Sequence, residues 1–139
     1  MTPHLIEICH NVDSRFLPYD PGQTLTEVFS TWRLLPADSI TPEEIADWAY
    51  RVFNVDLDHL EDSRTVLGGE GDFLLAAVYR LLGLRSLSTG DVIAVTGTGP
   101  TVWLACEFNG WRRIERPTNL IGEPLTADTI YRHIRRING

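Results

Sequence analysis

The stretch from Arg85 to Ile114 constrains the fold most, because turn signals separate its runs of β-branched and aromatic residues. Ser88-Thr89-Gly90-Asp91 and Gly97-Thr98-Gly99-Pro100 consist of residue types that form turns. The runs that follow these turns have the length and composition of β-strands. The predicted strands are Asp91–Thr96, Thr101–Phe108 and Trp111–Ile114. Three consecutive antiparallel strands are therefore expected from this stretch alone.

The last two of these strands are joined at Asn109-Gly110, which is the strongest hairpin signal in the sequence. Both residue types tolerate the positive φ angles of a type I′ turn. A two-residue loop would place Phe108 opposite Trp111 and Glu107 opposite Arg112. Aromatic pairs and opposite-charge pairs across strands each contribute roughly 0.2–1 kcal/mol. The sequence thus predicts a tight hairpin with this register.

The rest of the chain predicts one further strand, Leu5–Cys9, and four helices. Thr24 stands three residues before Glu27, and Thr41 three residues before Glu44, which is the spacing of a capping box. Apolar residues at helical spacing follow each of these signals. The predicted helices cover residues 25–35, 42–54 and 73–82, with a fourth that starts at Thr126. The helix over 73–82 is apolar on nearly every side and is expected at the centre of the core, whereas 56–71 is predicted as an acidic, irregular connection.

These elements predict an α+β fold in one domain that spans residues 1–139. The expected sheet is small and antiparallel, with three or four strands and a C-terminal meander, and about four helices pack against it. A chain of 139 residues is long enough to enclose one hydrophobic core. No internal repeat and no second-domain boundary is visible in the sequence.

Composition indicates a soluble cytoplasmic protein. The apolar fraction is 43% and the charged fraction 22%, and no apolar run approaches the roughly 18 residues of a membrane span. The N-terminal residues lack the basic region and apolar core of a secretory signal. The two cysteines, Cys9 and Cys106, fit a reducing compartment, in which each is expected to be a buried thiol. A disulfide between them is the less favoured alternative, which stays open because both lie in predicted strands that could be neighbours.

The charged residues are unusual in kind and in position. All 12 basic residues are arginines, which excludes mechanisms that need a P-loop, Schiff-base or general-base lysine. The net charge is −7, yet residues 111–139 carry six arginines against three acids. This basic end predicts either a contact with phosphate or an acidic partner, or cations that complement the negative end of a helix dipole.

No catalytic, cofactor-binding or metal-binding residues are predicted. The sequence contains no nucleophile elbow, no zinc-protease motif, no cysteine pair at metal spacing and no dinucleotide fingerprint. His4 and His10 bracket the first strand roughly 20 Å apart by strand rise, which is too far to share an ion. His59 lies in the acidic connection, and His133 lies among the C-terminal arginines.

Two sequence segments resemble the YodL-like domain of small bacterial, plasmid and phage proteins. They are Ser86-Leu87-Ser88-Thr89-Gly90-Asp91-Val92-Ile93 and Phe108-Asn109-Gly110-Trp111. The stretch Leu5–Phe29 also resembles the start of uncharacterised proteins that carry this ending. The chain departs from that pattern at Cys106-Glu107 and in a longer turn after Gly97. The resemblance implies no established reaction; it implies an accessory protein of a mobile element that acts on a host defence or nucleic-acid protein. The same Leu-Ser-x-Gly-Asp-Val-Ile turn and strand also occur in small RNA-binding barrels of the PUA or ASCH type.

Three functions are therefore compatible with the sequence. The first is a non-catalytic accessory or interaction protein with a protein partner. The second is an RNA- or DNA-binding module that uses the arginine-rich C-terminal part, and the third is an enzyme whose site is too dispersed to recognise. The sequence does not predict an oligomeric state. The residues predicted to bind a partner are Trp103, Asn109, Trp111, Arg112, Arg113, Arg132, Arg135 and Arg136.

Overall fold

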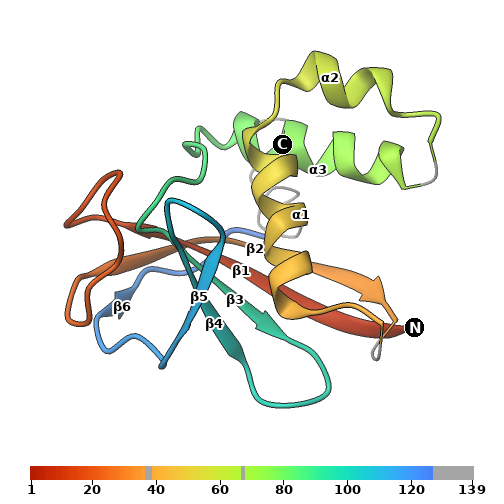
Figure 1. The fold of residues 1–139 in the computed structure, drawn as a ribbon. Helices are drawn as coiled ribbons and strands as arrows, with labels where there is room; N and C mark the ends of the chain where they lie inside the picture. The colour runs from red at the N-terminus through yellow and green to blue at the C-terminus, as the bar shows by residue number, and fades with distance from the viewer. Residues whose placement is uncertain (37–38, 67, 127–139) are drawn as a thin grey trace, which may run out of the picture.

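The computed structural model describes residues 1–36, 39–66 and 68–126. Within them, six strands form one curved sheet in the order β5-β4-β3-β1-β2-β6, which closes about half of a barrel (Figure 1). The strands are β1 (Thr2–Asn11), β2 (Leu25–Leu35), β3 (Val92–Thr96), β4 (Val102–Cys106), β5 (Trp111–Ile114) and β6 (Leu120–Ile121). The prediction of a small sheet of three or four strands is therefore wrong.

The sheet is mixed, whereas a purely antiparallel sheet was predicted. β1 pairs antiparallel with β2 on one side and with β3 on the other, and the meander from β3 to β5 is also antiparallel. β6 pairs parallel with the start of β2 through Leu25 and Thr26. The predicted meander is confirmed, and the sheet is larger because β2 and β6 extend it beyond β1.

Residues 25–35 form the strand β2, so the helix predicted there is wrong. The spacing of Leu25 and Phe29 suggested one helical face, but a β-bulge separates them: Cys9 pairs with Glu27 and Ile8 with Phe29, and Val28 is the extra residue. A bulge moves the following residues to the opposite face of the sheet. Leu25 and Phe29 are therefore both buried, in two different hydrophobic clusters.

Three helices lie in the described residues, namely α1 (Pro42–Asn54), α2 (Leu57–Asp62) and α3 (Gly69–Leu81). α1 has the predicted bounds, and the Thr41 hydroxyl accepts the Glu44 backbone N–H at 3.1 Å as its cap. α2 lies where an irregular connection was predicted. The fourth predicted helix, from Thr126 onward, lies outside the described residues except for Thr126 itself.

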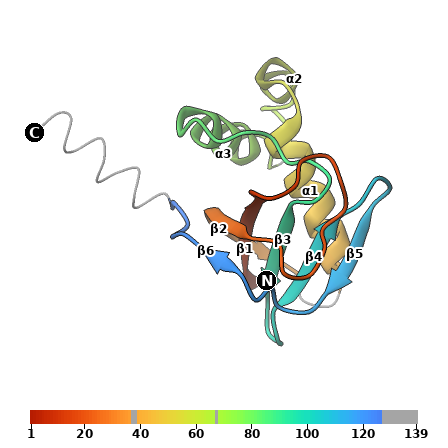
Figure 2. The ribbon, with the colours of Figure 1, turned by 90° about the vertical axis from the view of Figure 1, so that its left-hand side faces the viewer.

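α3 differs from its prediction in length and in place. It begins at Gly69 rather than near Phe73, and it ends before Gly83, which has the left-handed φ of +74° expected of a helix stop. Its apolar sides suggested a central helix, but only Gly69, Ala76 and Tyr79 are buried. Figure 2 shows α3 on the β2 side of the molecule, while β5 forms the opposite edge. Part of the apolar surface of α3 is therefore exposed.

The hairpin between β4 and β5 has a wider loop than predicted. Cys106 lies opposite Trp111, so residues 107–110 form a four-residue connection, and only Gly110 has a positive φ. The predicted opposition of Phe108 and Trp111 is wrong. Arg112 still contacts Glu107, with Nε 2.8 Å from the carboxylate, although its direct partner across the strands is Ala105.

Both faces of the sheet carry apolar clusters. The larger cluster lies between the sheet and the helices and includes Ile6, Phe29, Phe53 and Tyr79. The smaller cluster lies on the other face and is formed by Cys9, Tyr19, Leu25, Val92 and Ala105. Two buried faces explain why β3 is apolar from Val92 to Val95.

Candidate functional site

The outer edge of β2 is covered over only part of its length. β6 pairs with Leu25 and Thr26, and Leu125 continues along the edge, accepting the Ser30 amide at 3.0 Å and donating to the Val28 carbonyl at 3.1 Å. Among the described residues, no backbone hydrogen bond joins the edge beyond this point. The part of the edge from Thr31 to Leu35 is called the open edge below.

The direction of the backbone groups on this edge follows from strand geometry. N–H and C=O groups of successive residues point alternately to the two sides of a strand. Because the Ser30 amide points outward to Leu125, the amides and carbonyls of Trp32 and Leu34 also point outward. Pro3 lies opposite Leu34 and has no N–H, which is tolerated because that pair exchanges no hydrogen bonds.

Two side chains of the open edge, Trp32 and Leu34, are large, apolar and exposed. Trp32 is 67% exposed and Leu34 is 61% exposed. Large exposed apolar residues on an unpaired edge strand are uncommon, because such an edge can pair with another chain. The open edge therefore has both the hydrogen-bonding groups and the apolar side chains that a further strand needs.

A groove of about 660 Å³ runs between this edge and α3. Its lining residues come from β2, from α3 and from the residue after Leu125: Phe29, Ser30, Thr31, Trp32, Gly71, Leu74, Leu75, Val78 and Thr126. A second hollow of about 270 Å³ adjoins it and shares Thr31, Trp32, Gly71 and Leu75. Together they are called the β2–α3 groove.

Gly71 gives the groove its width on the α3 side. A Cβ atom built on Gly71 would have no heavy atom within 4 Å, so the space above it is open. Leu74, one turn further along α3, is 53% exposed. The apolar excess that the sequence of α3 shows is thus presented to the groove.

The far end of the groove is held by a cluster of polar and aromatic contacts. The Arg33 guanidinium lies 4.0 Å from the Trp48 ring centroid. The Trp48 indole N–H donates to Asp72 at 3.1 Å, and Arg51 is 3.3 Å from the same carboxylate. Burial lowers the pKa of Arg33 from its usual value. These contacts join β2, α1 and α3, so the two walls of the groove are fixed relative to each other at this end.

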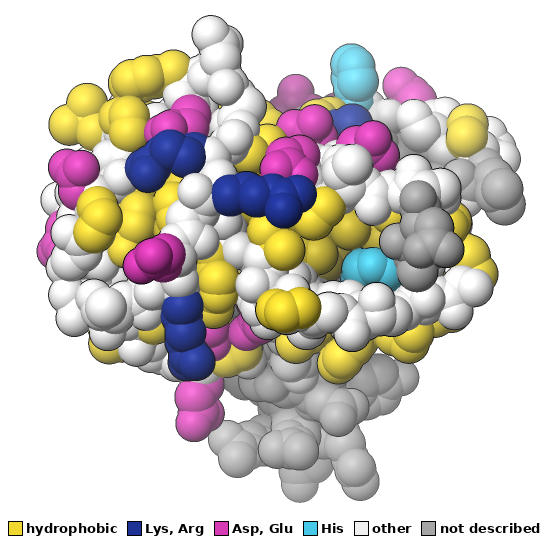
Figure 3. All heavy atoms as spheres, turned by 60° about the horizontal axis from the view of Figure 1, so that its bottom comes forward, with side chains coloured by type: hydrophobic (Ala, Val, Ile, Leu, Met, Phe, Trp, Pro, Cys, Tyr) yellow, Lys and Arg dark blue, Asp and Glu magenta, His cyan; other side chains and the backbone are white. Residues whose placement is uncertain are grey.

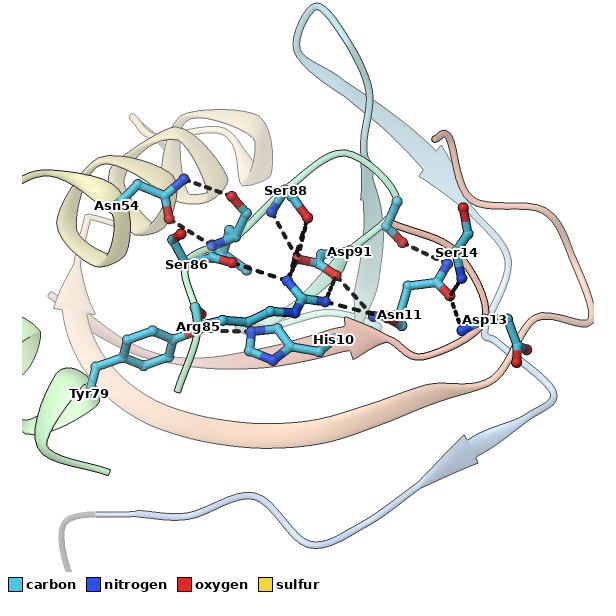
Figure 4. A network of polar contacts seen from close by, with 12 residues as sticks. His10, Asn11, Asp13, Ser14, Asn54, Tyr79, Arg85, Ser86, Ser88 and Asp91 are labelled. Carbon is cyan, nitrogen blue, oxygen red and sulfur yellow. Dashed lines mark hydrogen bonds and ion pairs between the residues drawn. The ribbon is translucent and has the colours of Figure 1, made fainter. Parts of the chain in front are cut away.

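A buried polar network near the start of β3 is a second candidate site (Figure 4). Asp91 is 1% exposed, and its carboxylate accepts hydrogen bonds from both terminal guanidinium nitrogens of Arg85, at 2.7 and 2.8 Å. The amides of Asn11 and Ser88 donate to the same carboxylate at 2.9 and 2.8 Å. Each carboxylate oxygen thus has its partners within the chain, and the network joins the end of β1 to the turn before β3.

His10 extends this network toward α3. The Tyr79 hydroxyl donates to the Arg85 carbonyl at 2.6 Å, so the His10 Nε2, at 2.9 Å, donates to the Tyr79 oxygen. Burial, with Arg85 nearby, lowers the pKa of His10 to about 4, and the ring is therefore neutral at pH 7. His10 lines neither hollow of the β2–α3 groove. The network acts as a structural connection among β1, α3 and the segment before β3.

The hairpin residues predicted to bind a partner make contacts within the chain. The Trp111 indole donates to Asp47 at 2.8 Å, and Arg113 forms a two-pronged ion pair with Glu43 at 2.8 and 2.9 Å. Both contacts attach β5 to α1. Besides its ion pair with Glu107, Arg112 donates to the Tyr19 carbonyl at 2.7 Å.

The other predicted residues are separated from this group. Trp103 is half-buried and packs on the smaller cluster of the sheet, on the face away from the helices. Asn109 is exposed in the hairpin loop. Arg132, Arg135 and Arg136 lie outside the described residues. On the face shown in Figure 3, arginine side chains lie singly beside acidic ones rather than in one basic patch.

The described part of the chain also bears on metal binding, thiol chemistry and membrane insertion. No group of three or more His, Cys, Asp and Glu side chains there could hold a metal ion. Cys9 and Cys106 are buried free thiols, and burial raises the pKa of both, that of Cys106 to about 11. None of the helices in residues 1–36, 39–66 and 68–126 combines the length and apolarity that crossing a membrane requires.

Comparison of the chain with models of known protein families, with curated proteins and with solved structures gave no match. The sequence did not predict a site at the groove residues Trp32, Gly71 and Leu74 or at the neighbouring edge residue Leu34. The apolar composition of α3 was the one signal for these residues. A helix that is apolar on all sides lies either at the centre of the core or with part of its apolar surface exposed. The incorrect helix at 25–35 concealed the edge strand that α3 lies beside.

Proposed function

We propose that the protein is a non-catalytic interaction module that binds an extended apolar segment of a partner protein. The segment adds as a further strand to the open edge of β2 and places side chains in the β2–α3 groove. The observation that carries the proposal is the coincidence of outward backbone groups at Trp32 and Leu34 with an apolar groove along the same edge. Strand addition uses both features, since the backbone provides affinity and the pockets provide specificity.

The chain itself supports strand addition at this edge. Leu125 already lies beside β2 as a parallel bridge partner of Phe29, with hydrogen bonds to Val28 and Ser30. The edge therefore has the geometry to accept an extended backbone. A bound strand at Trp32 and Leu34 would continue the same row of hydrogen bonds.

The groove also sets the chemistry of the partner segment. Side chains of a strand alternate between two faces, so every second residue of the partner would point toward α3. The lining there is apolar, from Leu74, Leu75 and Val78. The partner segment should therefore carry Leu, Ile, Val, Phe or Met at alternate positions. The segment should also lack proline where its own amides must donate to β2.

Nucleic-acid binding through the hairpin receives less support. Arg112 and Arg113 each pair with a carboxylate of the chain, and an arginine must give up such a pair to neutralise a phosphate. The accessory role in a mobile element, the host protein as partner and a cytoplasmic location remain part of the proposal. They rest on the YodL-like resemblance and on the two reduced cysteines.

A displayed library of random twelve-residue peptides, selected on the folded protein, tests this function. The proposal expects enriched peptides with apolar residues at alternate positions. It also expects that Gly71→Arg abolishes binding, because the new side chain fills open space in the groove.

Gly99→Arg is the matched control. Gly99 lies in the turn between β3 and β4, and a Cβ atom there also meets nothing within 4 Å. Binding should survive this change. Peptides without the alternating pattern, or equal loss in both variants, would contradict the proposal.

A further inference from the structure

The loop of the β4–β5 hairpin and α1 enclose a separate hollow of about 240 Å³. It is lined by Asp47, Tyr50, Thr89, Cys106, Glu107, Phe108, Asn109, Gly110 and Trp111. This hollow includes Asn109 and Trp111, which the sequence singled out and the β2–α3 groove does not use. It is called the hairpin hollow below. Cofactor and drug-sized pockets measure about 300–1,000 Å³, so this volume suits a single side chain.

Aromatic rings form the sides of the hairpin hollow. Tyr50 and Trp111 stand edge to face, with ring centroids 6.3 Å apart. The Trp111 ring is fixed by the hydrogen bond from its indole to Asp47. Phe108 is 69% exposed and Tyr50 is 42% exposed, so both rings are open to a ligand. Faces of aromatic rings attract organic cations, and several rings around one hollow recognise ammonium and guanidinium groups.

Carboxylates supply the matching charge. Asp47 and Glu107 both line the hollow, and Arg112 neutralises one of them through Glu107 Oε1 at 2.8 Å. Two carboxylates and one guanidinium leave a local charge of −1. The molecule as a whole carries −7, which further favours a positive ligand.

One carboxylate of the hollow is open to a ligand. Asp47 is exposed, and its Oδ1 accepts the Trp111 indole N–H at 2.8 Å. Hydrogen bonds from a charged donor to a carboxylate are stronger than those between neutral groups. A cation that carries N–H groups can donate to Asp47, whereas a quaternary ammonium cannot.

We propose that the hairpin hollow binds the cationic side chain of an arginine or lysine on a partner. Tyr50, Phe108 and Trp111 surround the cation, and the exposed Asp47 carboxylate accepts a hydrogen bond from it. This site is independent of the β2–α3 groove, from which it differs in every lining residue. A partner that carries an apolar strand and a separate cationic residue could occupy both sites.

The test is a titration of ¹⁵N-labelled protein with N-acetyl-arginine amide, observed at the indole N–H signal of Trp111. The expected result is a saturable shift of that signal. N-acetyl-citrulline amide has the same shape without the charge and should bind at least about tenfold more weakly. Lysine amide acetylated at its α-amino group should bind, because its side-chain ammonium also carries N–H donors. Tetramethylammonium should bind more weakly than either amide.

Two variants connect the shift to the site. Tyr50→Leu removes one aromatic wall at an exposed position and should weaken arginine binding several-fold. Phe16→Leu is the matched control, since Phe16 is also an exposed aromatic residue, at 61%, and lies outside the hairpin hollow. Far-ultraviolet circular dichroism should show both variants folded.

Four results would overturn the proposal. These are no saturable shift with the arginine amide, equal affinity for citrulline, equal affinity for tetramethylammonium, and equal weakening by Phe16→Leu. None of them depends on Gly71, so failure here is distinct from failure of the groove.

Discussion

Leu125 donates its backbone N–H to the Val28 carbonyl at 3.1 Å. The Leu125 carbonyl then accepts the Ser30 amide at 3.0 Å, and the covered part of the β2 edge ends there in the described chain. Beyond it, exposed Trp32 and Leu34 lie beside a groove whose other wall is α3. A half-covered edge of this kind combines a place for a strand with pockets for its side chains.

Gly69 and Gly71 should respond in opposite ways to alanine, although both lie in the first turns of α3. A Cβ atom on Gly69 would lie 1.9 Å from the Ser63 carbonyl oxygen, so Gly69→Ala should destabilise by about 2 kcal/mol or more. Gly71→Ala meets no atom and should stabilise by about 0.5 kcal/mol, because alanine is the better helix former. Urea denaturation measures both values, and stabilisation by Gly69→Ala would refute the packing described.

Asp91→Asn should strongly destabilise the protein. It would leave the Arg85 guanidinium, half-buried, without its ionic partner, and an amide nitrogen would replace one acceptor of backbone hydrogen bonds. The expected loss is about 3–5 kcal/mol in the free energy of unfolding. Glu70→Gln is the control, since that ion pair with Arg64 is exposed and should matter little. A small effect of Asp91→Asn would show that the network is not a structural connection.

His10 should make stability fall on acidification. Its pKa is lowered from 6.5 to about 4 in the folded protein, so the unfolded chain binds the proton more tightly. Stability is therefore lost as the pH falls from about 6.5 toward 4, by up to about 3 kcal/mol. His10→Gln should remove this part of the pH dependence, while His59→Gln, at an exposed position, should leave it intact. Chemical denaturation at pH 7, 6, 5 and 4 compares the three proteins.

Glu7 should have the opposite pH dependence. Burial, followed by the neighbouring Glu27, raises the pKa of Glu7 above 4.5. A carboxyl with a raised folded pKa stabilises the protein at low pH and loses that contribution as the pH rises through the folded pKa. Glu7→Gln should therefore stabilise the protein at pH 7 and have less effect at pH 4. A variant that is less stable than the parent at pH 7 would contradict this assignment.

Local sequence signals predicted the structure correctly where it depends on residues close together in the chain. The cap at Thr41 and the apolar stripe of α1 need no distant partner, and the meander from β3 to β5 is connected by turns. The hairpin register could not be obtained in this way. The attachment of Trp111 to Asp47 and of Arg113 to Glu43 involves residues of α1 that are remote in sequence. These tertiary contacts accompany a four-residue loop rather than the tighter turn that Asn109-Gly110 favours.

The candidate groove was missed because two predictions were wrong, one for each wall of the groove. Because of the bulge at Val28, the apolar residues of β2 do not alternate regularly along the strand. Their spacing resembles that of a helix, so the edge strand was not recognised. Without this edge strand, no groove was expected beside α3, and its apolar surface was assigned to the core. Long-range pairing of β2 with β1 outweighs local helical spacing, because ten residue pairs join the two strands.

Hydrogen exchange at single backbone amides of β2 tests the open edge most directly. In the free protein, the Trp32 and Leu34 amides should exchange rapidly, while the Thr31 and Arg33 amides, which point toward β1, should be protected. Adding a peptide selected on the groove should slow exchange at the Trp32 and Leu34 amides. In the Gly71→Arg variant, the same peptide should leave the exchange of these amides unchanged. If Trp32 and Leu34 are already protected without peptide, or stay unprotected with it, the account of β2 as a binding edge is wrong.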